Sequence, residues 1–241
     1  MLPQIGRDWN QLITLHAHGC GGVNFYVRAL ALGVWFVVAP AFAAEAALGG
    51  LLRAVEQRYN RAKTLEVLFE QRYTTQGRTR AESGRLWLRK PGRMRWEYST
   101  PSGKLFVSDG KFVYFYSPAS NRAEKSKLKE SEDLRAPLAF LLGKLDFDKE
   151  FQSFRSSQEQ DGTLIKASAK SNRLPYSEVE FLVTPGSEIR RLTVRGQDRT
   201  TLEYSFAGEK LNPVVDDLMF RFKLPPGAEF VEILDEDERR P

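Results

Sequence analysis

Only three side chains in this sequence carry a thiol or an imidazole, and all three lie near the N-terminus. They are His16, His18 and Cys20, in the stretch HAHGCGG. If this segment is removed on export, the remaining chain has no thiol nucleophile, no imidazole base, no Cys/His zinc site and no disulfide. Catalysis would then depend on carboxylates, hydroxyls or amines.

The carboxylates are plentiful, but their spacing does not single out a reacting pair. Glu70, Glu97 and Asp109 each lie on a polar strand face or beside a turn, whereas glycoside cleavage needs two carboxyl groups at a defined separation. The sequence contains no G-x-S-x-G, no Walker loop and no dinucleotide fingerprint. We therefore expect no enzyme, no metal and no organic cofactor.

The N-terminal segment has the pattern of a secretory signal. Arg28 precedes an apolar run over residues 29–39, and small residues follow at Ala41-Phe42-Ala43. We predict cleavage after Ala43. The alternative is a short membrane anchor, but a span needs about 18–20 apolar residues.

Two details of this segment bear on the domain boundaries. Residues 1–27 are long for the charged part of a signal, so a downstream start near Val23 is a further hypothesis. Lipid attachment at Cys20 is not favoured, because the apolar run follows the cysteine. We predict a signal region over residues 1–43 and a single domain over 44–241.

Composition indicates a packed globular domain. Of the 241 residues, 41% are hydrophobic and 12% aromatic, and the formal net charge is +5. The basic residues are scattered along the chain, whereas nucleic-acid interfaces usually cluster them. We therefore expect no nucleic-acid partner.

Period-two alternation predicts a mainly β fold. In RLWLRKPGRMRWEY, residues 85–98, one parity is apolar and the other carries arginines. Similar runs recur every 8–12 residues, without alternating helices, and predict about eleven antiparallel strands that curl into a half or whole barrel. Tight turns are expected at Pro91-Gly92, Asp109-Gly110, Asp161-Gly162 and Pro185-Gly186.

Two segments have helical rather than strand periodicity. Leu48, Leu51, Leu52 and Val55 predict an amphipathic helix over residues 48–59. A second helix is predicted over residues 134–145, and its apolar positions are Leu134, Leu138, Leu141, Leu142 and Leu145.

The apolar face of the strands has two interpretations, a packed core under the helices or the wall of a ligand cavity. Its expected members are large: Phe69, Leu86, Leu88, Met94, Trp96, Tyr98, Phe112, Tyr114 and Tyr116. Periodicity alone favours the core.

Ordered motifs resemble those of the periplasmic outer-membrane lipoprotein carrier family, the LolA proteins. The resemblance spans about residues 48–232. Its motifs are Phe69-Glu70-Gln71, then Gly84-Arg85-Leu86-Trp87-Leu88-Arg89-Lys90-Pro91, then Trp96, then Val107-Ser108-Asp109-Gly110-Lys111 with Tyr114, Tyr116 and Pro118.

The resemblance implies an incomplete antiparallel barrel with a lid of short helices over a hydrophobic cavity. It implies a periplasmic, monomeric carrier that takes acylated lipoproteins from an inner-membrane ABC transporter to an outer-membrane acceptor, without a cofactor. The acyl-chain cavity would then be lined by Phe69, Leu86, Leu88, Met94, Trp96, Tyr98, Tyr114, Leu138, Leu141 and Leu142.

One position departs from the family pattern. The family arginine that ties the lid shut stands directly before the proline, and here that position is Lys90. A lysine offers a point charge instead of a planar fork. Lys90 shares parity with Leu86 and Leu88, so we expect it to serve as the lid latch. The alternative is a surface lysine beside a turn.

Two other functions remain open. A membrane-anchored acceptor or lipid-sensing domain of the same fold would need a cysteine after an apolar run. A periplasmic glycan-acting enzyme would need a placed carboxylate pair.

Overall fold

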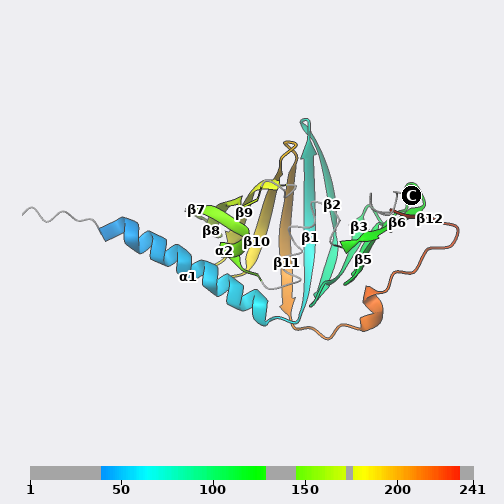
Figure 1. The fold of residues 1–241 in the computed structure, drawn as a ribbon, viewed down its shortest axis with the longest axis horizontal. Coiled ribbons are helices and arrows are strands. Elements are labelled where there is room, and N and C mark those ends of the chain that lie inside the picture. Colours follow the sequence, from blue (N-terminus) through cyan, green and yellow to red (C-terminus); the bar gives the residue numbers. More distant parts are fainter. Residues whose placement is uncertain (1–38, 129–144, 172–175, 234–241) are drawn as a thin grey trace, which may run out of the picture. The chain divides into compact units, whose positions relative to one another are not determined.

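Most of the described chain is β-strand. The computed structural model describes residues 39–128, 145–171 and 176–233 (Figure 1). The elements in chain order are α1 (Ala39–Arg61), β1 (Thr64–Thr75), β2 (Arg78–Arg89), β3 (Arg93–Thr100), β4 (Leu105–Asp109), β5 (Phe112–Ser117), β6 (Arg122–Lys127), α2 (Phe147–Glu150), β7 (Phe151–Glu159), β8 (Gly162–Ala169), β9 (Tyr176–Val183), β10 (Ile189–Gly196), β11 (Thr201–Leu211), the 3-10 turn η3 (Asp217–Phe220) and β12 (Glu229–Glu232).

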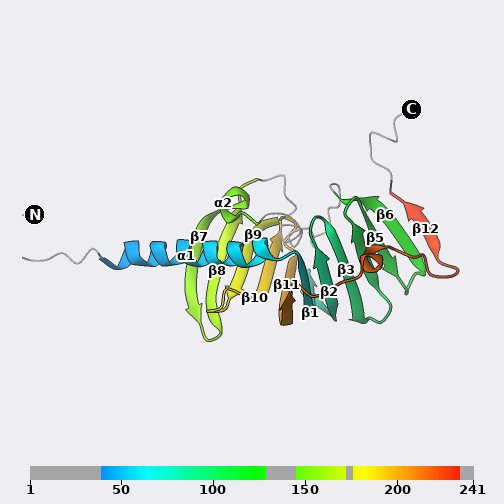
Figure 2. The same ribbon diagram turned by 90° about the horizontal axis from the view of Figure 1, so that it is seen from below.

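The strands form one open sheet in the order β12-β6-β5-β4-β3-β2-β1-β11-β10-β9-β8-β7. Figure 2 shows them side by side from β7 to β12, with α1 across the half that contains β7–β11. The predicted mainly antiparallel fold is confirmed, with twelve strands in the described residues instead of about eleven. The extra strand, β12, comes after Pro225-Pro226-Gly227 and pairs with β6 in parallel.

One face of the sheet, here called the inner face, carries a continuous apolar cluster. Cross-strand register places Phe106 opposite Trp96, Trp96 opposite Leu86, and Leu86 opposite Val67. The same cluster extends through β8–β11, where Phe181, Leu192 and Tyr204 are buried. Because side chains alternate across a strand, this single register puts every second residue into the core.

A glycine shapes the centre of the inner face. Gly84 lies opposite Phe69 on β1 and Tyr98 on β3. A Cβ at residue 84 would lie only 2.0 Å from the carbonyl oxygen of Glu97. The Phe69 ring packs edge-on against Trp96 and Tyr98, at centroid distances of 4.8 and 5.1 Å. Glycine therefore allows the close approach of β2 and β3 beside this aromatic group.

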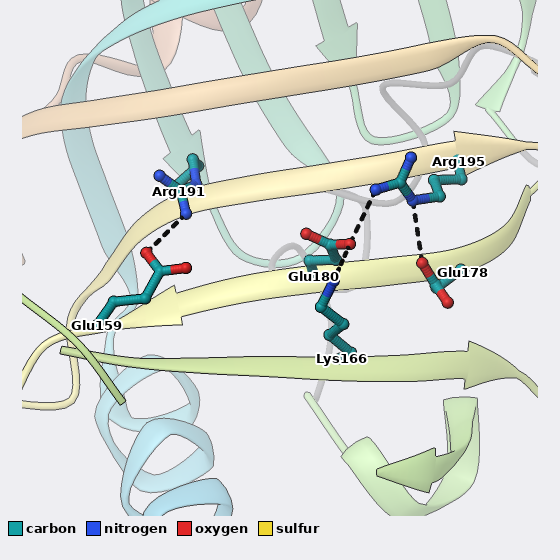
Figure 3. A network of polar contacts seen from close by, with 6 residues as sticks. All are labelled: Glu159, Lys166, Glu178, Glu180, Arg191 and Arg195. Carbon is teal, nitrogen blue, oxygen red and sulfur yellow. Dashed lines mark hydrogen bonds and ion pairs between the residues drawn. The ribbon is translucent and has the colours of Figure 1, made fainter. Parts of the chain in front are cut away.

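The opposite, outer face of β7–β10 is charged. Glu180 accepts hydrogen bonds from Lys166 on β8 and Arg195 on β10, at 2.8 and 3.0 Å (Figure 3). Arg195 also donates to Glu178, and Arg191 donates to Glu159. Burial alone would raise the pKa of Glu180, but the hydrogen bonds from Lys166 and Arg195 outweigh it and hold that pKa below its ordinary value.

The segment between β11 and β12, here called the strap (residues 212–228), crosses the outer face of β3–β5. Asp217 accepts hydrogen bonds from Arg89 and Arg93, and Arg95 donates to the carbonyl of Met219. Phe220 is buried. Residues 217–220 form the turn η3, and Asp216 caps it by accepting a hydrogen bond from the backbone N–H of Leu218.

The predicted helix over residues 48–59 is confirmed and extends over Ala39–Arg61. The second predicted helix, over residues 134–145, lies outside the described residues except for Leu145, which is buried. The short helix α2 was not anticipated. Most of the predicted signal region lies in residues 1–38, which are not described. The predicted cleavage site after Ala43 falls within α1 and stays a prediction.

Candidate functional site

Six of the predicted cavity residues meet on the inner face. Each is at most 4% exposed. They are Phe69 on β1, Leu86 and Leu88 on β2, and Met94, Trp96 and Tyr98 on β3. Their side chains form one contiguous apolar surface, as the alternation of residues 85–98 predicts.

Tyr114 does not share this surface. Its strand pairs Tyr114 with Val107, and Val107 lies opposite Arg95, so Tyr114 points to the outer face. There its ring stacks on Phe222 of the strap, at 5.0 Å. Phe115 occupies the inner position instead, opposite Phe106.

Asp109 closes the turn between β4 and β5. Asp109 accepts hydrogen bonds from the backbone N–H groups of Lys111 and Phe112 and so closes a tight turn. Phe112 and Tyr116 lie two residues before and after Tyr114 on β5, so they too are on the outer face and not on the predicted inner face. The other predicted wall residues, Leu138, Leu141 and Leu142, lie outside the described residues.

Helix α1 packs an apolar stripe on the half of the inner face that contains β7–β11. Leu52, Val55 and Tyr59 belong to the same buried cluster as the strand residues. Their spacing of three and four residues places them on one side of the helix. The stripe over residues 48–55 was predicted, and Tyr59 continues it by one turn.

The phenol of Tyr59 fixes the end of α1 to the sheet. Its hydroxyl donates to Glu209 at 2.6 Å and accepts from the backbone N–H of Ile189 at 2.9 Å. Arg58 donates to the same carboxylate. Burial, with the adjacent Glu209 charge, raises the pKa of Tyr59 far above its ordinary value, so this phenol remains a hydrogen-bond donor.

Lys90 holds the same turn of the helix from the other side. Its ammonium donates to the backbone carbonyl of Tyr59 at 2.8 Å, and its backbone N–H donates to the carbonyl of Lys63 at 2.9 Å. Carbonyls in the last turn of a helix lack partners within the helix and carry the negative end of its dipole. Burial lowers the pKa of Lys90. We call the contact between Lys90 Nζ and the Tyr59 carbonyl the latch.

Little space remains beneath the latch. A void of about 10 Å³ lies among Tyr59, Leu65, Leu88 and Lys90. That volume holds at most one water molecule. The end of α1 is therefore packed closely onto β1 and β2, and an acyl chain could enter here only after the helix moves.

Two further residues of α1 hold the segment that precedes α2. The side-chain amide of Asn60 donates to the carbonyl of Leu145 and accepts from its backbone N–H, both at 2.7 Å. Glu56, one turn earlier, accepts from the backbone N–H of Phe147 at 2.7 Å. No pattern in the sequence links these residues, because their partners lie more than eighty positions away.

Two further features are absent from the described residues, a metal-binding cluster and a membrane-spanning helix. Within them, no three His, Cys, Asp or Glu side chains are grouped to hold a metal ion. None of the described helices combines the length and hydrophobicity that crossing a bilayer requires.

Comparison with known proteins gives a consistent result. The family described as "Outer membrane lipoprotein carrier protein LolA" matches residues 60–223. A protein named "Outer-membrane lipoprotein carrier protein" from Sodalis glossinidius is 28% identical over 194 residues, which cover 80% of this chain and 90% of that protein. The protein of the same name from Pseudomonas aeruginosa strain UCBPP-PA14 is 28% identical over 215 residues, covering 87% and 97%.

Among solved structures, an uncharacterized conserved protein from Thermus thermophilus has a TM-score of 0.48 at 13% identity, covering 78% of this chain and 99% of that one. The family match includes the inner-face residues of the strands, Lys90 of the latch and residues 212–223 of the strap. This chain belongs to the LolA family of outer membrane lipoprotein carrier proteins.

Proposed function

We propose that this chain is a periplasmic carrier that binds the acyl chains of lipoproteins on its inner face and delivers them to the outer membrane. One observation carries the proposal. One half of a large apolar face, over β7–β11, is crossed by a single amphipathic helix whose end is held by a few polar contacts. A helix packed this way can separate from the sheet without unfolding it. Family membership supports the same function.

The chemistry of the inner face suits hydrocarbon. Its wall combines aliphatic and aromatic side chains, and each buried methylene of a bound chain contributes about 0.8 kcal/mol. Met94 adds a flexible thioether that can adapt to chains of different shape. Acyl chains would replace the stripe of Leu52, Val55 and Tyr59, which covers part of this face in the closed state.

The latch would control the exchange. Moving the end of α1 breaks the bond from Lys90 to the Tyr59 carbonyl and separates the Tyr59 phenol from Glu209. Both contacts lie on one helical turn, so they open together. Lys90 thereby takes the role of the family arginine with a single ammonium.

The route follows from the family. The signal pattern would send the chain to the periplasm, an inner-membrane ABC transporter would load it as a monomer, and an outer-membrane acceptor would unload it. An acceptor or lipid sensor of the same fold would bind the same chains but would not pass them on.

The test is displacement of an environment-sensitive apolar dye by a synthetic triacylated lipopeptide. We expect the protein to bind the dye and the lipopeptide to displace it. Leu88→Gln, on the inner face, should weaken both, whereas Leu68→Gln, at an exposed outer position, should change neither. Leu88→Met keeps an apolar side chain at this position, so it shows whether substitution on this strand by itself changes dye or lipopeptide binding.

Delivery needs a second measurement, transfer of a labelled lipoprotein from the loaded protein to outer-membrane vesicles. A protein that binds the lipopeptide but retains it in the presence of these vesicles would be the sensor or acceptor. If Leu88→Gln stays folded and binds both ligands normally, the inner face is not the binding surface.

A further inference from the structure

A second pocket lies at the junction of α1 and β1, outside the inner face. Figure 1 shows the end of α1, the start of β1 and the end of β11 together below the sheet. The pocket has a volume of about 610 Å³, within the range of about 300–1,000 Å³ that is typical of ligand sites.

Four cations line this pocket, and none of the described residues that line it is acidic. They are Arg61, Lys63, Arg89 and Lys90. Arg89 donates a hydrogen bond to Asp217, which is not part of the pocket lining, and Lys90 donates one to the Tyr59 carbonyl. Arg61 and Lys63 are exposed. Among the described residues, the chain places no carboxylate against either side chain.

The floor of the pocket is rigid. The backbone N–H of Lys63 donates to the side chain of Asn212 at 2.8 Å, and Thr64 Oγ1 donates to the carbonyl of Pro213 at 2.7 Å. The backbone N–H of Asn212 donates to the carbonyl of Thr64 at 2.8 Å. These bonds tie Lys63 and Thr64 to residues 212 and 213, so the floor of the pocket is formed before any ligand arrives.

The lining is not purely ionic. Val214 is fully exposed at the rim, and Val215 is buried beside it. A single inorganic phosphate would fill little of the volume and would leave Val214 uncovered. A flat bilayer surface cannot enter a concave site. Carboxylates next to an apolar side chain complement both parts of the lining.

We propose that this pocket is a docking site for a short acidic segment of a partner protein, and that docking loosens the latch. A carboxylate in the pocket would compete with the Tyr59 carbonyl for the ammonium of Lys90, because that ammonium belongs to both sites. The loosening rests on the proposed function, whereas the docking does not.

Docking is tested by fluorescence anisotropy with a labelled peptide of alternating Glu and Leu, against a matched Gln/Leu peptide. We expect only the acidic peptide to bind, and added salt to weaken it. The double variant Arg61→Gln/Lys63→Gln should bind about tenfold more weakly. The control Arg78→Gln/Lys223→Gln removes the same charge at exposed positions elsewhere and should bind normally.

Two results would overturn the docking site. One is equal weakening by the two double variants, which would indicate a net-charge effect. The other is binding to phosphatidylglycerol vesicles that depends on Arg61 and Lys63 while the acidic peptide does not bind, which would assign the pocket to a membrane. The anisotropy assay with the peptides contains no lipid cargo, so its outcome is independent of the carrier function.

Loosening is tested by repeating the dye titration with saturating peptide. Wild-type protein should bind the dye more tightly with the peptide than without it. Lys90→Met should show no such gain, because its latch is already absent. If wild-type protein binds the peptide with unchanged dye affinity, docking and the latch are not coupled.

Discussion

The replacement Lys90→Met tests the latch most directly. Methionine keeps an unbranched apolar stem beside Leu88 and removes only the ammonium that bonds to the Tyr59 carbonyl at 2.8 Å. A hydrogen bond that involves a charged group contributes about 1.5–3 kcal/mol. Burial of the ammonium, which lowers the pKa of Lys90, offsets part of this gain. The net contribution to the closed state is therefore about 1–2 kcal/mol.

That free energy sets the expected change in ligand binding. A loss of about 1–2 kcal/mol shifts the ratio of open to closed protein about 5- to 30-fold. If the ligand binds only the open protein and the closed protein dominates, its apparent affinity rises by the same factor. Lys90→Met should therefore bind the apolar dye about 5- to 30-fold more tightly and release a bound lipopeptide more slowly.

The assay is a dye titration with a thermal melt on the same samples. Lys90→Arg keeps a charged donor and should stay close to wild type. Lys223→Met removes an exposed lysine from the strap and serves as the matched control. A dye affinity for Lys90→Met no higher than that of Lys223→Met would refute the latch, provided that both variants melt cooperatively.

Three further predictions concern the fold and the helix contacts. Gly84→Ala places a Cβ against the Glu97 carbonyl and should lower the free energy of unfolding in urea by about 1–3 kcal/mol. In the control Gly77→Ala nothing lies within 4 Å of the new Cβ, although φ is positive, so the loss of stability should be smaller. Asn60→Ala removes both bonds to Leu145 and should speed hydrogen exchange at the Leu145 amide while the sheet amides stay protected; uniform protection would contradict it. The folded-state pKa of Glu180 lies below its ordinary value of 4.5. Its ionised carboxylate therefore stabilises the fold above pH 4.5, and this contribution is lost as the pH falls through the lowered pKa. The difference in unfolding free energy between wild type and Glu180→Gln should shrink in acid.

Local pattern was enough to predict most of the sheet. Alternation in residues 85–98 placed β2 and β3, and Asp109-Gly110 placed the turn of the β4–β5 hairpin. These signals work because a strand with one buried face must alternate, and a tight turn needs particular residues. The inner-face leucines and Trp96 followed from the same rule.

The errors arose where long-range geometry decides. Tyr114 was assigned to the inner face because it is large and aromatic, but its register places it against Phe222, more than a hundred residues away. No local pattern predicted the strap, whose residues 217–220 form the turn η3 and contact the outer face of β3 and β4. One sequence does not contain the information about which distant segment covers which face.

Lys90 shows how sequence and structure combine. Its parity with Leu86 and Leu88 indicated that its side chain points inward, and the resemblance implied a contact with lid carbonyls. The structure supplies the acceptor, the Tyr59 carbonyl in the last turn of α1. It also shows that Tyr59, through Glu209 and Ile189, is a second anchor of the same turn.

The strength of such a latch matters because of the size of the cargo. Three acyl chains carry on the order of forty methylenes, whose complete burial would contribute roughly 30 kcal/mol. The practical limit of non-covalent affinity is roughly 20 kcal/mol. A carrier that gained all of this free energy could not release its cargo. A closed state in which Leu52, Val55 and Tyr59 already cover part of the inner face competes with the acyl chains for that surface and lowers their net affinity. A latch of about 1–2 kcal/mol then suffices to shift the balance between retention and release, and transfer to an acceptor can proceed without ATP hydrolysis by this protein.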